Sequence, residues 1–257
     1  MAEDPLHVVF GSGQVGLALA ARLAGASTSV RTVSRHRPAA LVDGVDWRVA
    51  DATDPDATAD AAKGASVVYQ CLNAPGTKWP ELFPPLQQNV PSAAEDTDTL
   101  LANLYGYGPA GGKPMTEDLP LAATTKKGRA WAAMTAKLLA AAKDGRARVA
   151  IGRASDFFGA GVTEPTLGAR VFGNAVAAKR AEFIGNPNLP HTYSYVPDIA
   201  VGLATLATDE RAVGQVCHLP GPEMVTTRAL LELVAVEVGP SVEVRNVGNV
   251  ALRARHA

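Results

Sequence analysis

The segment of residues 11–16, Gly-Ser-Gly-Gln-Val-Gly, has the residue types and spacing of a phosphate-binding loop. It follows a short apolar run at residues 7–10 and precedes an Ala- and Leu-rich segment at residues 14–24. Between a strand and a helix, the first glycine permits a tight turn, the second lets the backbone approach a pyrophosphate, and the third lets helix and strand pack closely. The amides that open the helix then face the anion. The motif predicts a dinucleotide site formed by Gly11, Ser12, Gly13, Gln14, Val15 and Gly16.

Two arginines stand about 20 residues beyond this loop, where a second strand should end. Proteins that prefer NAD usually carry a carboxylate here, which bonds the ribose 2′-hydroxyl. This chain has Ser34-Arg35-His36-Arg37 instead. Guanidinium groups can pair with a 2′-phosphate, whereas a carboxylate would repel it. Ser34, Arg35 and Arg37 therefore favour NADP(H) over NAD(H), although solvated loop arginines would also be compatible with NAD(H).

Two further segments are expected to contact the same cofactor. Asp51 and Ala52 follow the third expected strand, where an adenine ring would lie, and Asp51 could accept from the adenine amino group. A plain helix-capping region would look the same. Leu72, Asn73 and Ala74 follow the fourth expected strand and should pass under the nicotinamide ribose.

Strand and helix patterns alternate through the first 155 residues, which is typical of a parallel sheet covered on both faces. The sequence predicts a Rossmann-type, doubly wound α/β fold. Pro91 should kink or shorten the third helix. Strands are expected at residues 7–10, 29–34, 45–50, 66–71, 99–103 and 148–151, and helices at 14–24, 56–62, 86–95 and 128–144.

The pattern changes after residue 155, and the remaining elements should complete the sheet and build a small C-terminal substrate lobe. We therefore expect a dinucleotide-binding domain at residues 1–155, interleaved with residues 156–257 in one structural unit. Residues 109–125 contain two glycines and three prolines and are expected to form a mobile flap. Helices are expected at residues 167–177, 197–208 and 227–238, the last capped by Thr226, and strands at 181–184, 191–195 and 215–218.

The chain resembles the extended and atypical short-chain dehydrogenases/reductases, the NAD-dependent epimerase/dehydratase type. The resemblance covers nearly the whole chain and implies a nicotinamide cofactor and a small carbonyl-containing substrate. It rests on residues 11–16, Asp51, Asn103-Leu104-Tyr105-Gly106-Tyr107-Gly108-Pro109, residues 152–159 and residues 193–200.

The catalytic signature of that family, Tyr-x-x-x-Lys with a nearby Ser or Thr, is missing. Tyrosines occur at positions 69, 105, 107, 193 and 195, and none has a lysine four residues later. Tyr105 and Tyr107 follow the fifth expected strand, and either could donate a proton to a carbonyl oxygen. Lys127 could lower the tyrosine pKa, and Asn103 could orient water or substrate. Alternatively, the two rings pack under the flap and Lys127 is solvated.

The substrate pocket is expected to draw on the segment after the sixth strand. The resemblance places Ser155 and Asp156 in a loop below the substrate, where they would bind it. Phe157 and Phe158 supply apolar surface that suits a small, fairly hydrophobic substrate. His191 lies near a turn at the expected pocket edge, where a structural role is the alternative.

Composition narrows the remaining possibilities. A net charge of −1 without a basic tract argues against nucleic acid, and no apolar run approaches the roughly 20 residues that span a membrane. The acidic start does not read as a signal peptide, so we expect a cytoplasmic protein with reduced Cys71 and Cys217. The five histidines are scattered, and no metal site is expected.

Two functions are compatible with these features. The first is an NADP(H)-dependent oxidoreductase or epimerase/dehydratase-like enzyme. The second is a non-catalytic NADP(H)-binding regulator or redox sensor resembling the NmrA-like group. The chain is shorter than most extended members of the family, so its pocket is expected to be open or completed by a partner chain, as in a homodimer.

Overall fold

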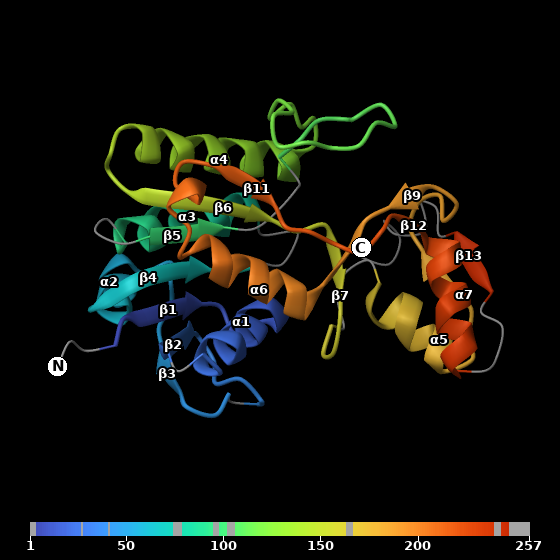
Figure 1. The fold of residues 1–257 in the computed structure, drawn as a ribbon, viewed down its shortest axis with the longest axis horizontal. Helices are drawn as coiled ribbons and strands as arrows, with labels where there is room; N and C mark the ends of the chain where they lie inside the picture. The colour runs from blue at the N-terminus through green and yellow to red at the C-terminus, as the bar shows by residue number, and fades with distance from the viewer. Residues whose placement is uncertain are drawn as a thin grey trace. The chain divides into compact units, whose positions relative to one another are not determined.

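The computed structural model describes residues 4–26, 28–40, 42–73, 79–94, 98–101, 106–162, 167–238 and 243–246. The chain divides into two compact units (Figure 1), which are described separately. Unit 1 contains Met1–Ala154 and Pro197–Leu219, and unit 2 contains Ser155–Val196 and Pro220–Ala257. Among the described residues, no helix has the length and apolar character needed to span a membrane.

Unit 1 is built on a sheet with the strand order β11-β6-β5-β4-β1-β2-β3. Every neighbouring pair is parallel. The chain moves outward from β1 to β3 and then returns to β4 on the other side of β1. This reversal opens a crevice at the carboxyl ends of β1 and β4, where open α/β sheets bind ligands. The strands are β1 (Leu6–Phe10), β2 (Ser29–Ser34), β3 (Val45–Val49), β4 (Ala65–Gln70), β5 (Asp98–Leu101), β6 (Arg148–Arg153) and β11 (Val216–His218).

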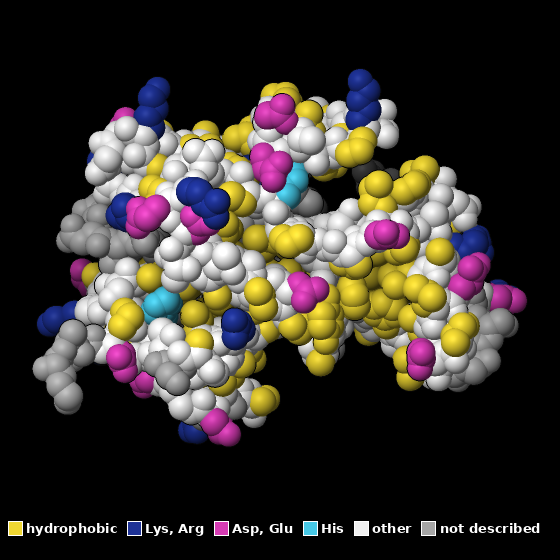
Figure 2. Space-filling view, in the orientation of Figure 1, with side chains coloured by type: hydrophobic (Ala, Val, Ile, Leu, Met, Phe, Trp, Pro, Cys, Tyr) yellow, Lys and Arg dark blue, Asp and Glu magenta, His cyan; other side chains and the backbone are white. Residues whose placement is uncertain are grey.

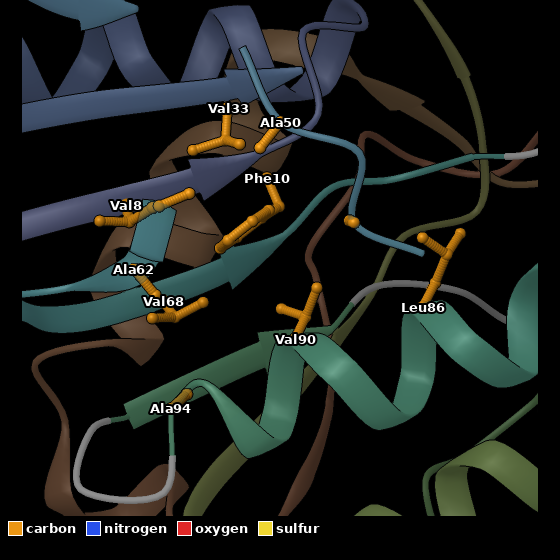
Figure 3. Close-up of a cluster of buried hydrophobic side chains, with 11 residues drawn as sticks. Val8, Phe10, Val33, Ala50, Ala62, Val68, Leu86, Val90 and Ala94 are labelled. Atoms are coloured by element: carbon orange, nitrogen blue, oxygen red, sulfur yellow. The ribbon is translucent and has the colours of Figure 1, made fainter. Parts of the chain in front are cut away.

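Helices cover both faces of this sheet (Figure 1). Val8, Phe10 and Val68 point from the strands toward α3 and pack in one buried cluster with its Leu86 and Val90 (Figure 3). On the opposite face, the Cβ position of Gly152 in β6 is contacted by leucines of α6. The helices are α1 (Gln14–Ala24), α2 (Pro55–Ala62), α3 (Trp79–Ser92), α4 (Lys126–Lys143) and α6 (Val196–Leu206).

The predicted α/β class and parallel sheet are confirmed, and each predicted strand of unit 1 ends within two residues of the observed one. The helix predicted at residues 86–95 is wrong at its start, because α3 begins at Trp79 and contains Pro84, Pro85 and Pro91. Phe83, Leu86 and Val90 share its buried face. Burial at this helical spacing therefore outweighs the loss of backbone donors at the prolines.

Unit 2 pairs its strands two by two: β7 with β10, β8 with β13, and β9 with β12. Its core contains Leu167, Val171, Tyr193 and Leu231. Apolar side chains are also exposed on its helices and gather over α5 in Figure 2. The elements are β7 (Asp156–Phe158), α5 (Asn174–Val176), β8 (Ala181–Phe183), β9 (Pro190–His191), β10 (Tyr193–Tyr195), β12 (Val225–Thr226), α7 (Thr227–Val238) and β13 (Val244–Asn246).

Two predictions for unit 2 need correction. The helix predicted at residues 167–177 is a π-helical segment, Gly168–Gly173, followed by the short α5. The strand predicted at residues 191–195 is split at Thr192, because β9 pairs with β12 while β10 pairs with β7. The helix predicted at residues 227–238 is confirmed, with the Thr226 hydroxyl accepting from the amide of Ala229 at 3.0 Å. Residues 109–125 contain no helix or strand, and their mobility stays a prediction.

The early start of α3 predicts a large effect for Phe83→Ala. Phe83 is 1% exposed, and its ring lies 5.3 Å from that of Trp131 in α4, centroid to centroid. Removing a buried phenylalanine side chain should lower the free energy of unfolding by about 3 to 5 kcal/mol. Gln88→Ala, on the exposed side of the same helix, should change it by less than about 0.5 kcal/mol. Urea unfolding measures both, and equal small effects would mean that residues 79–85 do not pack as described.

Candidate functional site: a dinucleotide loop and a Tyr-His-Arg cluster

The loop after β1 is held against the ends of β2 and β4. The Gly11 amide donates to the Val33 carbonyl at 2.8 Å, and the Cys71 amide donates to the Phe10 carbonyl at 2.8 Å. Gly11 has a φ of +114°, and a Cβ there would lie 2.6 Å from the Cys71 carbonyl oxygen. A side chain at position 11 would therefore be blocked by both backbone conformation and contact.

The other two glycines of the motif have different surroundings. A Cβ on Gly16 would lie 1.9 Å from the Gly11 carbonyl oxygen, so glycine is required for the loop to meet α1. A Cβ on Gly13 would meet nothing within 4 Å. Gly13 is the N-cap of α1, and no side chain of the N-cap residue accepts a hydrogen bond from the amides of the first turn. The first turn also carries no acidic residue. The open space and the helix start together suit an anion.

Three of the predicted cofactor residues are brought together at the ends of β2 and β3. The Ser34 hydroxyl donates to the His36 carbonyl at 2.8 Å and accepts from the Trp47 indole at 3.0 Å. The Arg37 guanidinium lies 5.8 Å from the centroid of the same indole ring. Ser34 and Arg37 thus contact Trp47 at this turn, and Arg35 and Arg37 are both exposed.

Asp51 lies near that arginine. Its carboxylate accepts from the backbone amide of Thr53 at 3.0 Å and from the Thr53 hydroxyl at 2.8 Å. The backbone bond is the main reason that the pKa of Asp51 is lowered, and the Arg35 charge adds to the effect. Asp51 is therefore ionised near neutral pH. Ala52 is buried, and its carbonyl accepts from the Asn89 side chain of α3 at 3.1 Å.

The segment after β4 is described only in part. Leu72 packs against the cluster that contains Val8 and Phe10, and Asn73 is exposed. Ala74 lies outside the described residues. Leu72 and Asn73 therefore stand beside the Gly11 loop at the carboxyl edge of the sheet, as the strand order requires.

A second cluster lies at the same edge of the sheet, where β6 and β11 end. Arg153 and His218 are the last residues of these neighbouring strands and are paired in register. The Tyr107 hydroxyl lies 2.8 Å from Nε2 of His218. The Arg153 guanidinium lies 4.3 Å from the centre of the Tyr107 ring. Glu117 accepts the His218 backbone amide at 2.9 Å.

Burial and charge act in opposite directions on Tyr107. Burial raises its pKa above the usual value, while the Arg153 guanidinium opposes that rise. Burial lowers the pKa of His218, which is therefore neutral at pH 7. The His218 amide holds the pKa of Glu117 below its ordinary value. Near neutral pH the cluster thus contains a protonated phenol, a neutral imidazole, a carboxylate and a guanidinium.

The other predicted catalytic residues are less closely defined. Asn103 and Tyr105 lie outside the described residues. Lys127 is the second residue of α4 and is partly buried. The sequence motifs do not identify His218 or Glu117, and they include Arg153 only as part of a family resemblance. Arg153 and His218 become neighbours through the pairing of β6 with β11, which is a feature of the three-dimensional fold.

The five predicted pocket residues all belong to unit 2. Nε2 of His191 lies 3.2 Å from Oδ2 of Asp156, without the alignment of a hydrogen bond. The Ser155 hydroxyl donates to the Thr192 carbonyl, and the Phe158 ring packs against Tyr195. Phe157 lies between Asp156 and Phe158 in β7. The pairing of β7 with β10 accounts for this grouping, and the substrate role of these residues stays a prediction.

The fold of this chain was compared with those of known proteins. No family model and no curated protein sequence matches the chain. Solved structures do match. UDP-glucose 4-epimerase from Thermus thermophilus, in complex with NAD, is 17% identical with a TM-score of 0.78, over 95% of this chain and 86% of that one. dTDP-glucose 4,6-dehydratase from Bacillus anthracis, in complex with NAD, is 14% identical with a TM-score of 0.82, over 95% of this chain and 85% of that one.

This chain has the fold of these epimerases and dehydratases. A short-chain dehydrogenase/reductase superfamily protein from Agrobacterium tumefaciens, with bound NAD, agrees with this result. It is 19% identical with a TM-score of 0.75, over 95% of this chain and 86% of that one. The resemblance inferred from the sequence is thus confirmed at the level of the fold. The chemistry must be argued from the residues, because fold alone does not fix function.

Gly13 and Gly16 predict losses of stability that differ in size. Gly16→Ala should lower the free energy of unfolding by at least about 2 kcal/mol, because the new methyl group would collide with a backbone oxygen. Gly13→Ala should cost less than about 1 kcal/mol, the usual difference at an N-cap. Urea unfolding of dinucleotide-free protein measures both. A Gly13→Ala protein as unstable as Gly16→Ala would contradict the open position at Gly13.

Proposed function

We propose that this protein binds NADP(H) and acts as an oxidoreductase or epimerase/dehydratase-like enzyme on a small carbonyl-containing compound. The loop of residues 11–16 carries the proposal. Its three glycines give a close approach to β4, an open position at the start of α1, and a tight junction between loop and helix. These are the three requirements of a pyrophosphate cradle in a Rossmann fold.

The residues around this cradle fit the rest of a dinucleotide. Asp51 lies at the end of β3, where an adenine amino group could donate to its carboxylate. Leu72 and Asn73 lie beyond β4 on the side expected for the nicotinamide ribose. The Thermus epimerase and the Bacillus dehydratase were both solved with NAD, which supports a nicotinamide dinucleotide as the ligand class for this fold.

The preference for the phosphorylated cofactor rests on Arg35. Residues 34–37 contain two arginines and no carboxylate. The Arg37 guanidinium lies 5.8 Å over the Trp47 ring, so Arg35 is the better candidate for the 2′-phosphate. Its closeness to Asp51 does not cancel this role, because a phosphate carries more negative charge than one carboxylate and can draw the flexible arginine side chain toward it.

When bound, the nicotinamide ring would supply or accept a hydride. The protein must then supply or accept a proton at the substrate oxygen. Tyr107 is the described tyrosine at this edge of the sheet, and its raised pKa keeps it protonated near neutral pH. It can therefore act as the acid when a carbonyl compound is reduced. Tyr105 remains a second candidate donor by its place in the sequence.

A binding protein without turnover is the competing proposal. The absence of Tyr-x-x-x-Lys favours it, since such a protein would need the dinucleotide loop but no proton donor. NADPH oxidation with a panel of aldehydes, ketones and enones separates the two functions. Turnover supports the enzyme, whereas tight binding that discriminates NADP+ from NADPH without turnover supports a redox sensor of the NmrA-like kind.

Arg35→Ala tests the cofactor preference. We expect the Kd for NADPH to rise about 10- to 100-fold, because a charge-assisted hydrogen bond contributes roughly 1.5 to 3 kcal/mol. The Kd for NADH should change less than about threefold. Isothermal titration calorimetry gives both values. Arg22→Ala, at the far end of α1, is the matched control and should change neither, and equal losses for NADPH and NADH in Arg35→Ala would refute the assignment.

Tyr107→Phe tests the proton donor. It removes only the hydroxyl oxygen, so we expect kcat to fall about 100- to 10,000-fold, the usual contribution of a general acid. The Kd for NADPH should stay within about twofold, because the loop of residues 11–16 is untouched. Steady-state kinetics and calorimetry measure the two effects. If Tyr105→Phe abolished turnover while Tyr107→Phe retained it, the role would pass to Tyr105.

A further inference from the structure

Arg153 is a buried cation without a carboxylate partner among the described residues. Its side chain is 2% exposed, and its Nε and Nη1 have no hydrogen-bond acceptor in the part of the chain that is described. Nη2 donates to the Thr135 hydroxyl over a long 3.4 Å. Burying an unpaired charge is costly. Negative charge that develops close to this guanidinium would therefore be stabilised.

Tyr107 is the group that can supply this charge. Its ring covers the Arg153 guanidinium at 4.3 Å, and the positive charge of Arg153 acts to lower the pKa of the phenol. Loss of the phenol proton would place a phenolate beside the guanidinium. The charge of Arg153 would then be compensated within the cluster, so the buried arginine favours the deprotonated state that a proton donor must pass through.

His218 gives this proton a route. Its Nε2 lies 2.8 Å from the Tyr107 oxygen, and the two rings meet edge to face at 66°. His218 is only partly buried. Glu117 anchors its backbone amide at 2.9 Å, which holds the residue at the end of β11. The imidazole can therefore contact the phenol through one nitrogen and exchange protons with water through the other.

We propose that His218 relays protons to Tyr107 and that Arg153 stabilises the Tyr107 phenolate, so that these two positioning residues replace the lysine of Tyr-x-x-x-Lys. The proposal rests on the proposed function, in which Tyr107 protonates a substrate oxygen. The role of the missing lysine is thus assigned to Arg153 and His218, which are distant in the sequence but adjacent at the ends of β6 and β11.

The proton balance of the relay is simple. The O–H bond of Tyr107 breaks as its proton moves to the substrate oxygen. The phenolate then takes the proton from Nε2 of His218 while Nδ1 gains one from water. The imidazole changes tautomer and stays neutral overall. One proton has passed from solvent to the substrate, and the reverse sequence serves alcohol oxidation.

The surrounding charges set the direction of the pH dependence. Burial lowers the pKa of His218 below 6.5, Glu117 opposes this effect, and Arg153 adds to it. Asp118 acts with Glu117 on Tyr107 and raises the phenol pKa. In alcohol oxidation, Nε2 of His218 must accept the Tyr107 proton, and protonated His218 cannot do so. Alcohol oxidation should therefore be present above the lowered His218 pKa and lost as the pH falls through it.

A titration of the folded, full-length protein tests the shared proton without substrate or cofactor. By NMR, Tyr107→Phe should raise the His218 midpoint by about half a pH unit or more, because the neutral ring loses a donor. The chain offers a matched control, since His7 Nδ1 lies 2.9 Å from the Tyr69 hydroxyl in the same unit. Tyr69→Phe should shift His7 and leave His218 unchanged. An unshifted His218 in Tyr107→Phe would overturn the relay.

The role of Arg153 is measured by the tyrosinate absorbance of Tyr107, obtained as the difference from Tyr107→Phe. Arg153→Met should raise the phenol midpoint by about one pH unit or more, a tenfold change in proton affinity. Arg153→Lys keeps the charge and should restore at least half of the shift. If Arg153→Met fails to fold, Arg153→Gln takes its place as the uncharged variant. An unchanged midpoint in the uncharged variant would refute the stabilising role.

His218→Gln tests the relay in turnover, because a glutamine amide can contact the Tyr107 hydroxyl but cannot relay a proton. We expect kcat to fall about 100-fold or more and the Kd for NADPH to stay within about twofold. The acid limb of the pH profile for alcohol oxidation should disappear. Retention of more than a tenth of the wild-type kcat would contradict the proposal. If wild type turns over no carbonyl compound, the proposed function fails. The two titrations then decide by themselves whether Tyr107 and His218 share a proton and whether Arg153 stabilises the phenolate.

Discussion

The close approach of the loop after β1 to the end of β4 is the constraint on which the candidate site depends. Gly11 meets the Cys71 carbonyl where no side chain could stand, and its amide is tied to β2. This contact fixes the start of α1 beside the point where the strand order reverses. The open position at Gly13 and the shared carboxyl edge of the sheet follow from it. The same carboxyl edge of the sheet carries Arg153 and His218 at the ends of β6 and β11.

The elements of unit 1 were predictable because their signals are local. α1 ends at Ala24, where the predicted helix ends, and Gly25 is its C-cap; β2 is flanked by Thr28 and Arg35. The errors arose where tertiary packing overrides such signals. α3 starts before a Pro-Pro pair because Phe83 is buried against α4. In unit 2, Thr192 separates two strands that have different partners, and residues 168–173 form a π-helical turn. None of these choices can be read from short-range periodicity.

The candidate site likewise has a part that was predictable from the sequence and a part that was not. The cofactor loop was predictable because three glycines at fixed spacing form one continuous motif. The structure gives Gly11 and Gly16 steric reasons and places Gly13 beside open space. The catalytic candidates were only partly predictable, because a search for Tyr-x-x-x-Lys looks along one helix. His218 and Arg153 are 65 positions apart in the sequence (218 − 153), and they meet only through the pairing of β6 with β11.

A site assembled from strand ends differs physically from one assembled on a helix. In Tyr-x-x-x-Lys, one helical turn sets the distance between the phenol and the cation, so the pair depends on local geometry. Here the distance is set by strand register and by the contact of Tyr107 with two side chains. Arg153 is buried and cannot move to follow the phenol, whereas a lysine side chain could. Such a site gains rigidity from the sheet, and it loses function if β11 shifts by one residue, because every side chain would then face the opposite side.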